Sequence, residues 1–379
     1  MKEFLLKGFE VELFTGRLTG ETVGVSDLVS NVFNDFEKEP DKRNLEYVTL
    51  PYKEYSKLRE ALLVPRRKLR KWLSLKDLTI LPGSTLSKGD SKKFERSDKS
   101  NPYHDFIELN YGTKVVTASV HINLGIKDIG FLFSALRLIR CEASLFLALS
   151  ASSPFLDGNL TNFHSYRWLQ FPRTPKKVPL FLDHANYVEW VKDHLDNGIM
   201  HNNRHLWSSV RPNGPNRPCE LNRLEMRICD LITDCDLLLA LTALFELRVL
   251  SLLLNPSKLD PLEASKLSLN ELEELSDENE KKVAKHSLDS NLYNWINGKE
   301  ISCRDWIVQL IEEVKPLALE MNILEKLSPL NTVLSDGNQA MRWMEAYLKG
   351  QSVQSLLKET INEMEIEESL PDHNSLTLG

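Results

Sequence analysis

Charged side chains alternate with apolar ones in several short segments, and this alternation constrains the fold more than any other feature of the chain. In GFEVELF, Glu10 and Glu12 alternate with Phe9, Val11 and Leu13. Because successive side chains of a β-strand point to opposite faces, this segment predicts a strand with one apolar and one acidic face. Taken alone, the segment is explained equally well by an edge strand whose polar face lies in water.

The same alternation recurs in three later segments. In ASVHINLG, His121 shares a face with Asn123, and in RLEMRICD, Glu225 shares a face with Arg227. In LEYVTLP, Glu46 alternates with Leu45 and Tyr47. In each segment, apolar residues occupy the opposite face. We therefore expect a sheet that forms the floor of a polar basin on one side and packs against the core on the other.

The order of the segments along the chain indicates the fold class. Strand-like segments dominate the first 125 residues, whereas the chain from Leu231 onward has mostly helical patterns, with no regular alternation of strand and helix. This order predicts an α+β fold, in which an antiparallel sheet carries helices on one face and the C-terminal half is largely helical. The most apolar segment, residues 237–254, contains Glu246 and Arg248, which favours a buried helix over a membrane span.

Two segments are expected at the surface. Residues 53–73 have helical spacing, and Pro65 is expected to break this helix. The basic cluster that follows the proline is interpreted as a solvated helix face. The acidic stretch from Gln351 to the end is expected to be flexible. The basic cluster consists of Arg66, Arg67, Lys68, Arg70 and Lys71. The predicted organisation is therefore a single catalytic domain over residues 1–350 and a flexible tail over residues 351–379.

Charge and cysteine content narrow the class of protein. The formal net charge is -7, which argues against nucleic acid or an anionic membrane as the main partner. The five cysteines include no C-x-x-C motif and read as reduced thiols. The N-terminal segment lacks the uninterrupted apolar stretch of a signal peptide. We expect a cytoplasmic protein that acts on small molecules, and the sequence leaves its oligomeric state open.

The polar face has the composition of a divalent metal site. Glu10, Glu12, Glu46 and Glu225 supply hard oxygen donors, and His121 adds one nitrogen. This donor set favours Mg²⁺, with Mn²⁺ as the alternative, over zinc, which prefers more cysteine and histidine. Each strand alone is ordinary, and a single histidine is more often a structural residue than a ligand. The four strands together favour a nucleotide–metal site.

A second part of the site is predicted in LALSASSPFLDGNLTNFHSYR and LWSSVRP. Hydroxyl and N–H groups of the serines in the first segment could line a pocket, and two arginines are candidate anchors for substrate carboxylates or phosphates. A helix C-terminus and a surface salt bridge explain the same residues without a ligand. No glycine-rich phosphate loop of the P-loop or G-x-G-x-x-G type is present. The candidate binding residues are Ser150, Ser152, Ser153, Arg167, Arg211 and Asn123.

The ordered segments GFEVELF, ASVHINLG, LALSASSPFLDG…SYR, LWSSVRP and RLEMRICD resemble the carboxylate–amine ligase superfamily that contains the plant, bacterial and cyanobacterial glutamate–cysteine ligases. The resemblance covers roughly residues 5–345. The serine–proline segment and RLEMRICD are its most specific parts. The short chain without an added domain is most similar to the cyanobacterial form.

The resemblance implies a glutamine-synthetase-like fold, with a curved antiparallel sheet, ATP and metal ions on its concave face and helices on its convex face. It also implies that ATP phosphorylates the γ-carboxylate of L-glutamate and that L-cysteine attacks the acyl phosphate, which is the first step of glutathione synthesis. Arg227 and Glu225 would then be catalytic. A ligase that joins glutamate to another amine and a non-catalytic nucleotide-binding member are the alternatives.

Overall fold

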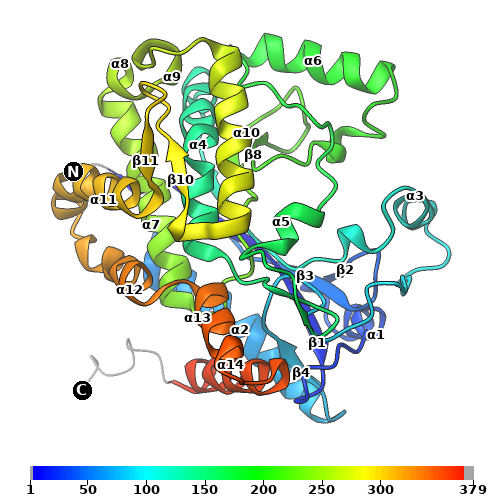
Figure 1. Ribbon diagram of the computed structural model, residues 1–379. Coiled ribbons are helices and arrows are strands. Elements are labelled where there is room, and N and C mark those ends of the chain that lie inside the picture. Colours follow the sequence, from blue (N-terminus) through cyan, green and yellow to red (C-terminus); the bar gives the residue numbers. More distant parts are fainter. Residues whose placement is uncertain (1–2, 371–379) are drawn as a thin grey trace, which may run out of the picture.

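The computed structural model describes residues 3–370, and a mixed sheet-and-helix architecture is built around one antiparallel sheet (Figure 1). Within the described residues this sheet has seven strands in the order β2-β3-β1-β5-β9-β8, and β4 also pairs with β1. Two short hairpins, β6–β7 and β10–β11, lie outside it. The strands are β1 (Lys7–Gly16), β2 (Phe36–Lys38), β3 (Asn44–Val48), β4 (Thr79–Leu81), β5 (Val120–Gly125), β6 (Phe155–Leu156), β7 (Asn159–Leu160), β8 (Val210–Asn213), β9 (Arg223–Met226), β10 (Asn291–Tyr293) and β11 (Glu300–Ser302).

The alternation in the sequence sets the two faces of this sheet. In β1, Phe9, Val11 and Leu13 are at most 3% exposed and enter the core, whereas Glu10 and Glu12 lie on the other face and are partly exposed. The same pattern holds in β5, where the apolar residues are fully buried. Strand pairing then places polar residues of different strands side by side.

Long helices cover the core face of the sheet. Helix α4 (Ile129–Ser150) packs against both α7 (Cys235–Leu254) and α10 (Leu269–His286), as Figure 1 shows, and α2 (Tyr55–Ser74) contacts α7 and β4. The predicted α+β class with an antiparallel sheet is confirmed. Helix α7 is long and apolar enough to cross a membrane, but 83% of its most apolar window is buried inside the protein, as a core helix would be.

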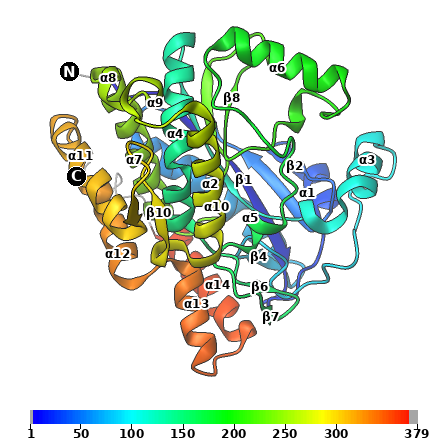
Figure 2. The same cartoon turned by 45° about the horizontal axis from the view of Figure 1, so that its top comes forward.

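The remaining helices surround this framework, and Figure 2 shows α6 and α3 projecting beside the sheet on the side away from α7. Helix α6 begins at the N-cap Asp183, whose side chain accepts a hydrogen bond from the Asn186 N–H. The other helices are α1 (Ser26–Val32), α3 (Pro102–Tyr111), α5 (Tyr166–Gln170), α6 (His184–Asp196), α8 (Pro256–Leu259), α9 (Pro261–Ala264), α11 (Cys303–Glu320), α12 (Ser328–Asp336), α13 (Gln339–Leu348) and α14 (Val353–Ser369), with 3₁₀ turns η1 (Gly112–Val115), η2 (Asn203–His205), η3 (Ser287–Asp289) and η4 (Leu324–Leu327).

Three expectations about the surface are wrong. The segment expected to be flexible forms α14, which runs to residue 369 and buries Leu357 and Ile361 against the protein. Helix α2 continues through Pro65, because leucines on both sides of the proline are buried. Its basic face is not solvated throughout, since Arg66 is only 4% exposed and pairs with Glu368 of α14. The end of the tail, residues 371–379, lies outside the described residues.

Candidate functional site

A first cluster on the polar face consists of Glu10, His121 and Glu225, one residue from each of three neighbouring strands. Ligand atoms of all three lie within 4.8 Å of one another. His121 Nδ1 is 2.9 Å from Glu10 Oε2 and 3.6 Å from Glu225 Oε1. The geometry follows from register, since Glu10 lies directly opposite His121 in the β1–β5 pair. Asn123 supports this Glu225 cluster by donating from Nδ2 to Glu10 Oε1 over 3.1 Å.

Two arginines converge on the fully buried carboxylate of Glu225. Arg211 donates from Nε and Nη2 to its two oxygens, at 2.7 and 3.0 Å, in a bidentate pair. Arg227 donates from Nη1 to Glu225 Oε1, and this nitrogen also lies 3.2 Å from His121 Nδ1. Although burial disfavours the charged form, the charges of Arg211 and Arg227 hold the pKa of Glu225 well below its usual range. Glu225 is therefore an anion at neutral pH, with two cations beside it.

A second cluster consists of Glu12, Glu39 and Glu46, whose ligand oxygens also lie within 4.8 Å of one another. Glu12 of β1 lies directly opposite Glu46 of β3, and Glu39 follows the end of β2. Three carboxylates share this Glu12 cluster. Ser119 joins the two clusters, because its hydroxyl donates to Glu12 Oε2 over 2.6 Å and lies 3.2 Å from His121 Nε2.

The electrostatics of the Glu12 cluster differ from those of the Glu225 cluster. Burial and the charge of Glu12 raise the pKa of Glu39 to about 7. Burial, together with the charges of Glu39 and Glu10, raises the pKa of Glu46 well above its usual range. Carboxylates repel each other at this separation unless a proton or a cation lies between them. The polar face thus has an acidic end at β1–β3 and an arginine-rich end at β8–β9.

Each sequence-predicted metal ligand lies in one of these two clusters, which is what alternation on paired strands predicts. Their role as ligands remains a prediction. Glu39 was missed, although it follows Glu37 at the same two-residue spacing that marks Glu10 and Glu12. Asn213 was also missed; it donates from Nδ2 to Glu225 Oε2 over 2.6 Å, a contact that only the β8–β9 pairing brings about.

The serine segment is structural. Ser152 and Ser153 are at most 1% exposed, and the carboxylate of Asp230 accepts from the Ser152 N–H and the Ser153 hydroxyl. The hydroxyl of Ser150 donates to the Phe146 carbonyl within α4. Ser150 also lies at the wall of a separate cavity, and a role of the three serines in substrate binding remains a prediction. They fold the chain around a buried aspartate.

In this structure Arg167 and Arg211 both bind groups of the protein itself, and their role as carboxylate anchors remains a prediction. Arg167 is 3% exposed, and its Nη1 and Nη2 donate to the carbonyls of Ile228 and Arg227, both over 3.0 Å. Arg211 uses Nε and Nη2 on Glu225 and its third nitrogen, Nη1, on the carbonyl of Leu206. These contacts connect Arg211 to Glu225 and Arg167 to the main chain of Arg227.

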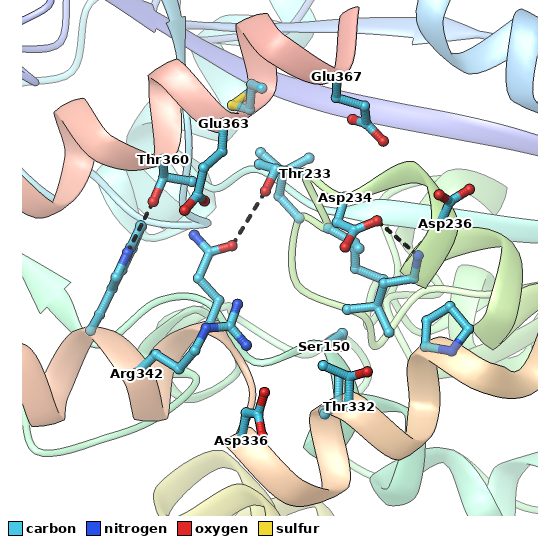
Figure 3. Close-up of a pocket in the computed structure, with 18 of the residues that line it drawn as sticks. Ser150, Thr233, Asp234, Asp236, Thr332, Asp336, Arg342, Thr360, Glu363 and Glu367 are labelled. Atoms are coloured by element: carbon cyan, nitrogen blue, oxygen red, sulfur yellow. Dashed lines mark hydrogen bonds between the residues drawn. The ribbon is translucent and has the colours of Figure 1, made fainter. Parts of the chain in front are cut away.

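A separate cavity of about 840 Å³ lies among α7, α12, α13 and α14 (Figure 3). Ser150 lies at its wall, together with Thr233 and Asp336, and the Thr233 hydroxyl is 3.3 Å from Gln339 Oε1. None of the residues of the two clusters lines this cavity. The carboxylate clusters of the sheet, rather than this cavity, hold the groups suited to metal and phosphate chemistry.

Known structures share this fold. The glutamate–cysteine ligase of Francisella tularensis, solved in complex with AMP, matches with a TM-score of 0.75 and 14% identity over 97% of this chain and 90% of that chain. A bifunctional glutathione synthetase from Pasteurella multocida matches with a TM-score of 0.74 and 14% identity over 96% of this chain and 53% of that one. At this level of identity, the two matches show a shared fold.

The chain belongs to glutamate–cysteine ligase family 2, which it matches over residues 6–368. Curated relatives include proteins named "Putative glutamate–cysteine ligase 2" from Sorangium cellulosum, 27% identical over 64% of this chain and 63% of that protein, and from Leifsonia xyli, 26% identical over 67% and 65%. A protein of the same name from Herpetosiphon aurantiacus is 23% identical over 74% of this chain and 70% of that protein. The chain thus spans just under two thirds of the first two relatives.

Proposed function

We propose that this protein is an ATP-dependent ligase that joins the γ-carboxylate of L-glutamate to the amino group of L-cysteine, with release of ADP and phosphate. The observation that carries this proposal is the division of one polar sheet face into an acidic end and an arginine-rich end. Such a face suits a reaction in which a nucleotide triphosphate and a substrate carboxylate, both anionic, must meet. Membership of glutamate–cysteine ligase family 2 supports the same assignment.

The donor set fits divalent ions. Glu12, Glu39 and Glu46 would hold one ion through oxygen ligands alone, and Glu10, His121 and Glu225 would hold another. We propose Mg²⁺, with Mn²⁺ as the alternative, since hard oxygen donors dominate both clusters. Bound ions would supply positive charge that offsets the repulsion between the triphosphate and the substrate carboxylate.

The residues of the chain supply the other requirements of the reaction. Arg227 is partly exposed on the polar face. Its guanidinium donates to Glu225, and its main-chain carbonyl accepts a hydrogen bond from Arg167, so both ends of the residue are held in place. A guanidinium held in this way stabilises charge on a phosphoryl group as it leaves ADP for the glutamate carboxylate. The cysteine amine then attacks the acyl carbon of the acyl phosphate, and phosphate leaves.

The proposed setting is the cytoplasm, where ATP and reduced cysteine are available. Four of the five cysteines are buried and all five are free thiols, which suits a reducing compartment. The proposed partners are small molecules: ATP, glutamate and cysteine. The net charge of -7 supports neither nucleic acid nor an anionic membrane as a partner.

A product assay tests the proposal. The purified protein is supplied with ATP, Mg²⁺, glutamate and a panel of amines that includes cysteine, and ADP, phosphate and the coupled product are measured. We expect ADP, phosphate and γ-glutamylcysteine in equal amounts. Formation of AMP and pyrophosphate would overturn the acyl phosphate mechanism. Coupling to another amine in preference to cysteine would assign a different acceptor to the same chemistry.

Substitutions of carboxylates test the site itself. Glu225→Gln should lower kcat by at least about 100-fold. Glu225 is fully buried between two arginines, so its substitution could also disturb folding. Glu12 is partly exposed, and Glu12→Gln should keep the fold more securely. This variant should need a higher Mg²⁺ concentration for half-maximal activity. Glu189→Gln, at an exposed position on α6, is the matched control and should retain full turnover. Normal turnover of both Glu225→Gln and Glu12→Gln would remove the two clusters from the mechanism.

A further inference from the structure

A further guanidinium, that of Arg217, lies close enough to Arg211, Glu225 and Arg227 to interact with their charges and makes no ion pair within residues 3–370. Arg217 lies in the loop between β8 and β9, and its Nη1 is buried without a hydrogen-bond partner among the described residues. Both oxygens of Glu225 already accept from Arg211, and one of them accepts from Arg227 as well. The charge of Glu225 therefore acts on Arg217 without a hydrogen bond between the two side chains being described.

The main chain around Arg217 is fixed by neighbouring elements. Asn203 Nδ2 of η2 donates to the Arg217 carbonyl over 2.9 Å, and His184 Nε2 of α6 donates to the Pro218 carbonyl over 2.9 Å. The loop also closes on itself, since the Glu220 N–H donates to the Asn216 carbonyl over 2.8 Å. A fixed loop that carries a half-buried, unpaired guanidinium is a preorganised anion site.

The surroundings of Arg217 are cationic. Burial and the charge of Arg211 lower the pKa of Arg217 to about 10. The buried Tyr187 lies within the same electrostatic environment, where burial raises its pKa to about 12 despite the opposing charges of Arg217 and Arg211. An anion at this position would relieve the repulsion between the guanidinium groups and pair with the buried Nη1.

The strand order indicates which anion belongs there. The Glu12 cluster is on β1–β3 at one end of the face, the Glu225 cluster lies in the middle, and Arg217 follows β8 at the far edge. The metal-bound triphosphate belongs at the acidic end. The opposite end of the face is then available to the part of the phosphoryl-accepting substrate, glutamate, that does not react. A planar guanidinium matches a carboxylate through two parallel hydrogen bonds.

We propose that Arg217 binds the α-carboxylate of glutamate, the carboxylate that is not phosphorylated. This inference rests on the proposed function and names the group that selects its acid substrate. Arg217 takes the role that the sequence assigned to Arg167 and Arg211, which the structure commits to internal partners. This role makes Arg217 a substrate-binding residue, so its substitution should change mainly the KM for glutamate.

The test compares glutamate with 4-aminobutyrate, which is glutamate without its α-carboxylate. In the wild-type protein, kcat/KM for glutamate should exceed that for 4-aminobutyrate by about 100-fold, the effect expected of a lost charged hydrogen-bond pair. In Arg217→Gln, KM for glutamate should rise about 10- to 100-fold, KM for ATP should stay within about threefold, and the preference over 4-aminobutyrate should largely disappear. Arg217→Lys, which keeps the charge but loses the planar fork, should give an intermediate preference.

Controls separate this inference from the proposed function. Arg342→Gln changes an exposed arginine at the separate cavity and should leave both the glutamate and the ATP constants unchanged. A wild-type protein that does not turn over glutamate would contradict the proposed function. An active wild-type protein whose preference for glutamate survives in Arg217→Gln would overturn the role of Arg217 alone. A rise in KM for ATP without a rise in KM for glutamate would also overturn this role, because Arg217 would then bind a phosphate of ATP. Thermal stabilisation by glutamate, lost in Arg217→Gln, provides a readout independent of turnover.

Discussion

Glutamates that face one another across neighbouring strands are the residue-scale feature on which the site depends. Glu46 lies opposite Glu12 on one side and opposite Glu37 on the other. Like charges directly opposite each other destabilise a sheet, so the pairing costs free energy unless protons or cations neutralise it. Burial, together with repulsion from the neighbouring carboxylates, raises the pKa values of Glu39 and Glu46.

This repulsion predicts the pH dependence of stability in the presence of a chelator. The folded-state pKa of Glu39 is about 7, above that of an unfolded glutamate, so the folded state binds more protons between about pH 4.5 and 7. The contribution of Glu39 to stability is therefore fully present at low pH and is lost as the pH rises through 7. Urea unfolding should show this loss as about 1–2 kcal/mol between pH 5.5 and 7.5. Glu39→Gln should flatten the profile, and an unchanged slope in that variant would contradict the assignment.

Arg167 provides a second residue-scale prediction, with the opposite kinetic pattern to Arg217. Its guanidinium holds the carbonyls of residues 227 and 228 and lies 3.7 Å from Asp230. Arg167→Met should lower kcat by about 10- to 100-fold because Arg227 loses its support, while KM for glutamate changes little. It should also lower the free energy of unfolding by about 3 kcal/mol, since Asp230 stays buried. A rise in KM alone would instead make Arg167 a substrate anchor.

Alternation on strands predicted which residues would share a face, because the two-residue period is a local property. It could not identify partners. That Arg211 pairs with Glu225 depends on the β8–β9 register, and that Arg167 turns toward main-chain carbonyls depends on the fold around Asp230. Residues that are far apart in sequence set these contacts, so no local pattern reveals them.

At the scale of elements, the contact between helices α2 and α14 accounts for the charged residues of both. The basic face of α2 and the acidic end of the chain each look solvated when considered alone, yet Arg66 and Arg70 both pair with Glu368. Helix α2 also runs through Pro65, although a proline lacks the N–H that would bond to the carbonyl one turn earlier. Buried Leu58 and Leu69, on either side of it, offset a cost of about 3 kcal/mol.

Glu368→Ala tests the contact between these helices. The substitution removes the carboxylate that Arg66 and Arg70 share and leaves the buried Arg66 only Glu367, at 3.4 Å. It should lower the free energy of unfolding by about 2 kcal/mol, measured by urea denaturation. Glu363→Ala, at an exposed position on the same helix, is the matched control and should change it by less than about 0.5 kcal/mol. Equal stabilities of the two variants would mean that α14 is held by its apolar face alone.

At the scale of the whole molecule, the sheet joins strands from the first 125 residues with β8 and β9, from residues 210–226, into one polar face. The fold class was predictable, because strand-like segments precede helical ones. The placement of α13 and α14 was not, since their amphipathic patterns do not specify which neighbour they cover. The match to the ligase family extends to residue 368 and so includes α14 in the body of the protein.

Metal binding should stabilise the whole fold, because the ions bind the folded state and neutralise its carboxylate pairs. At an ion concentration about 100 times the dissociation constant, the gain is about 2.7 kcal/mol, which should raise Tm by about 2–5 °C. Thermal unfolding with EDTA and with added Mg²⁺ measures this shift. The shift should fall by at least half in Glu12→Gln, and an equal shift in that variant would place the ions elsewhere.

Lys7, at the start of β1, has a consequence for the order in which this protein forms during synthesis. Its ammonium group is fully buried and lies 2.9 Å from both carboxylate oxygens of Glu246 in α7. The strand that carries Glu10 and Glu12 leaves the ribosome before α7, and Glu246 is translated more than two hundred residues after Lys7. Nascent chains that end before α7 should therefore lack a stably placed β1, and the polar face should form only after α7 has been synthesised.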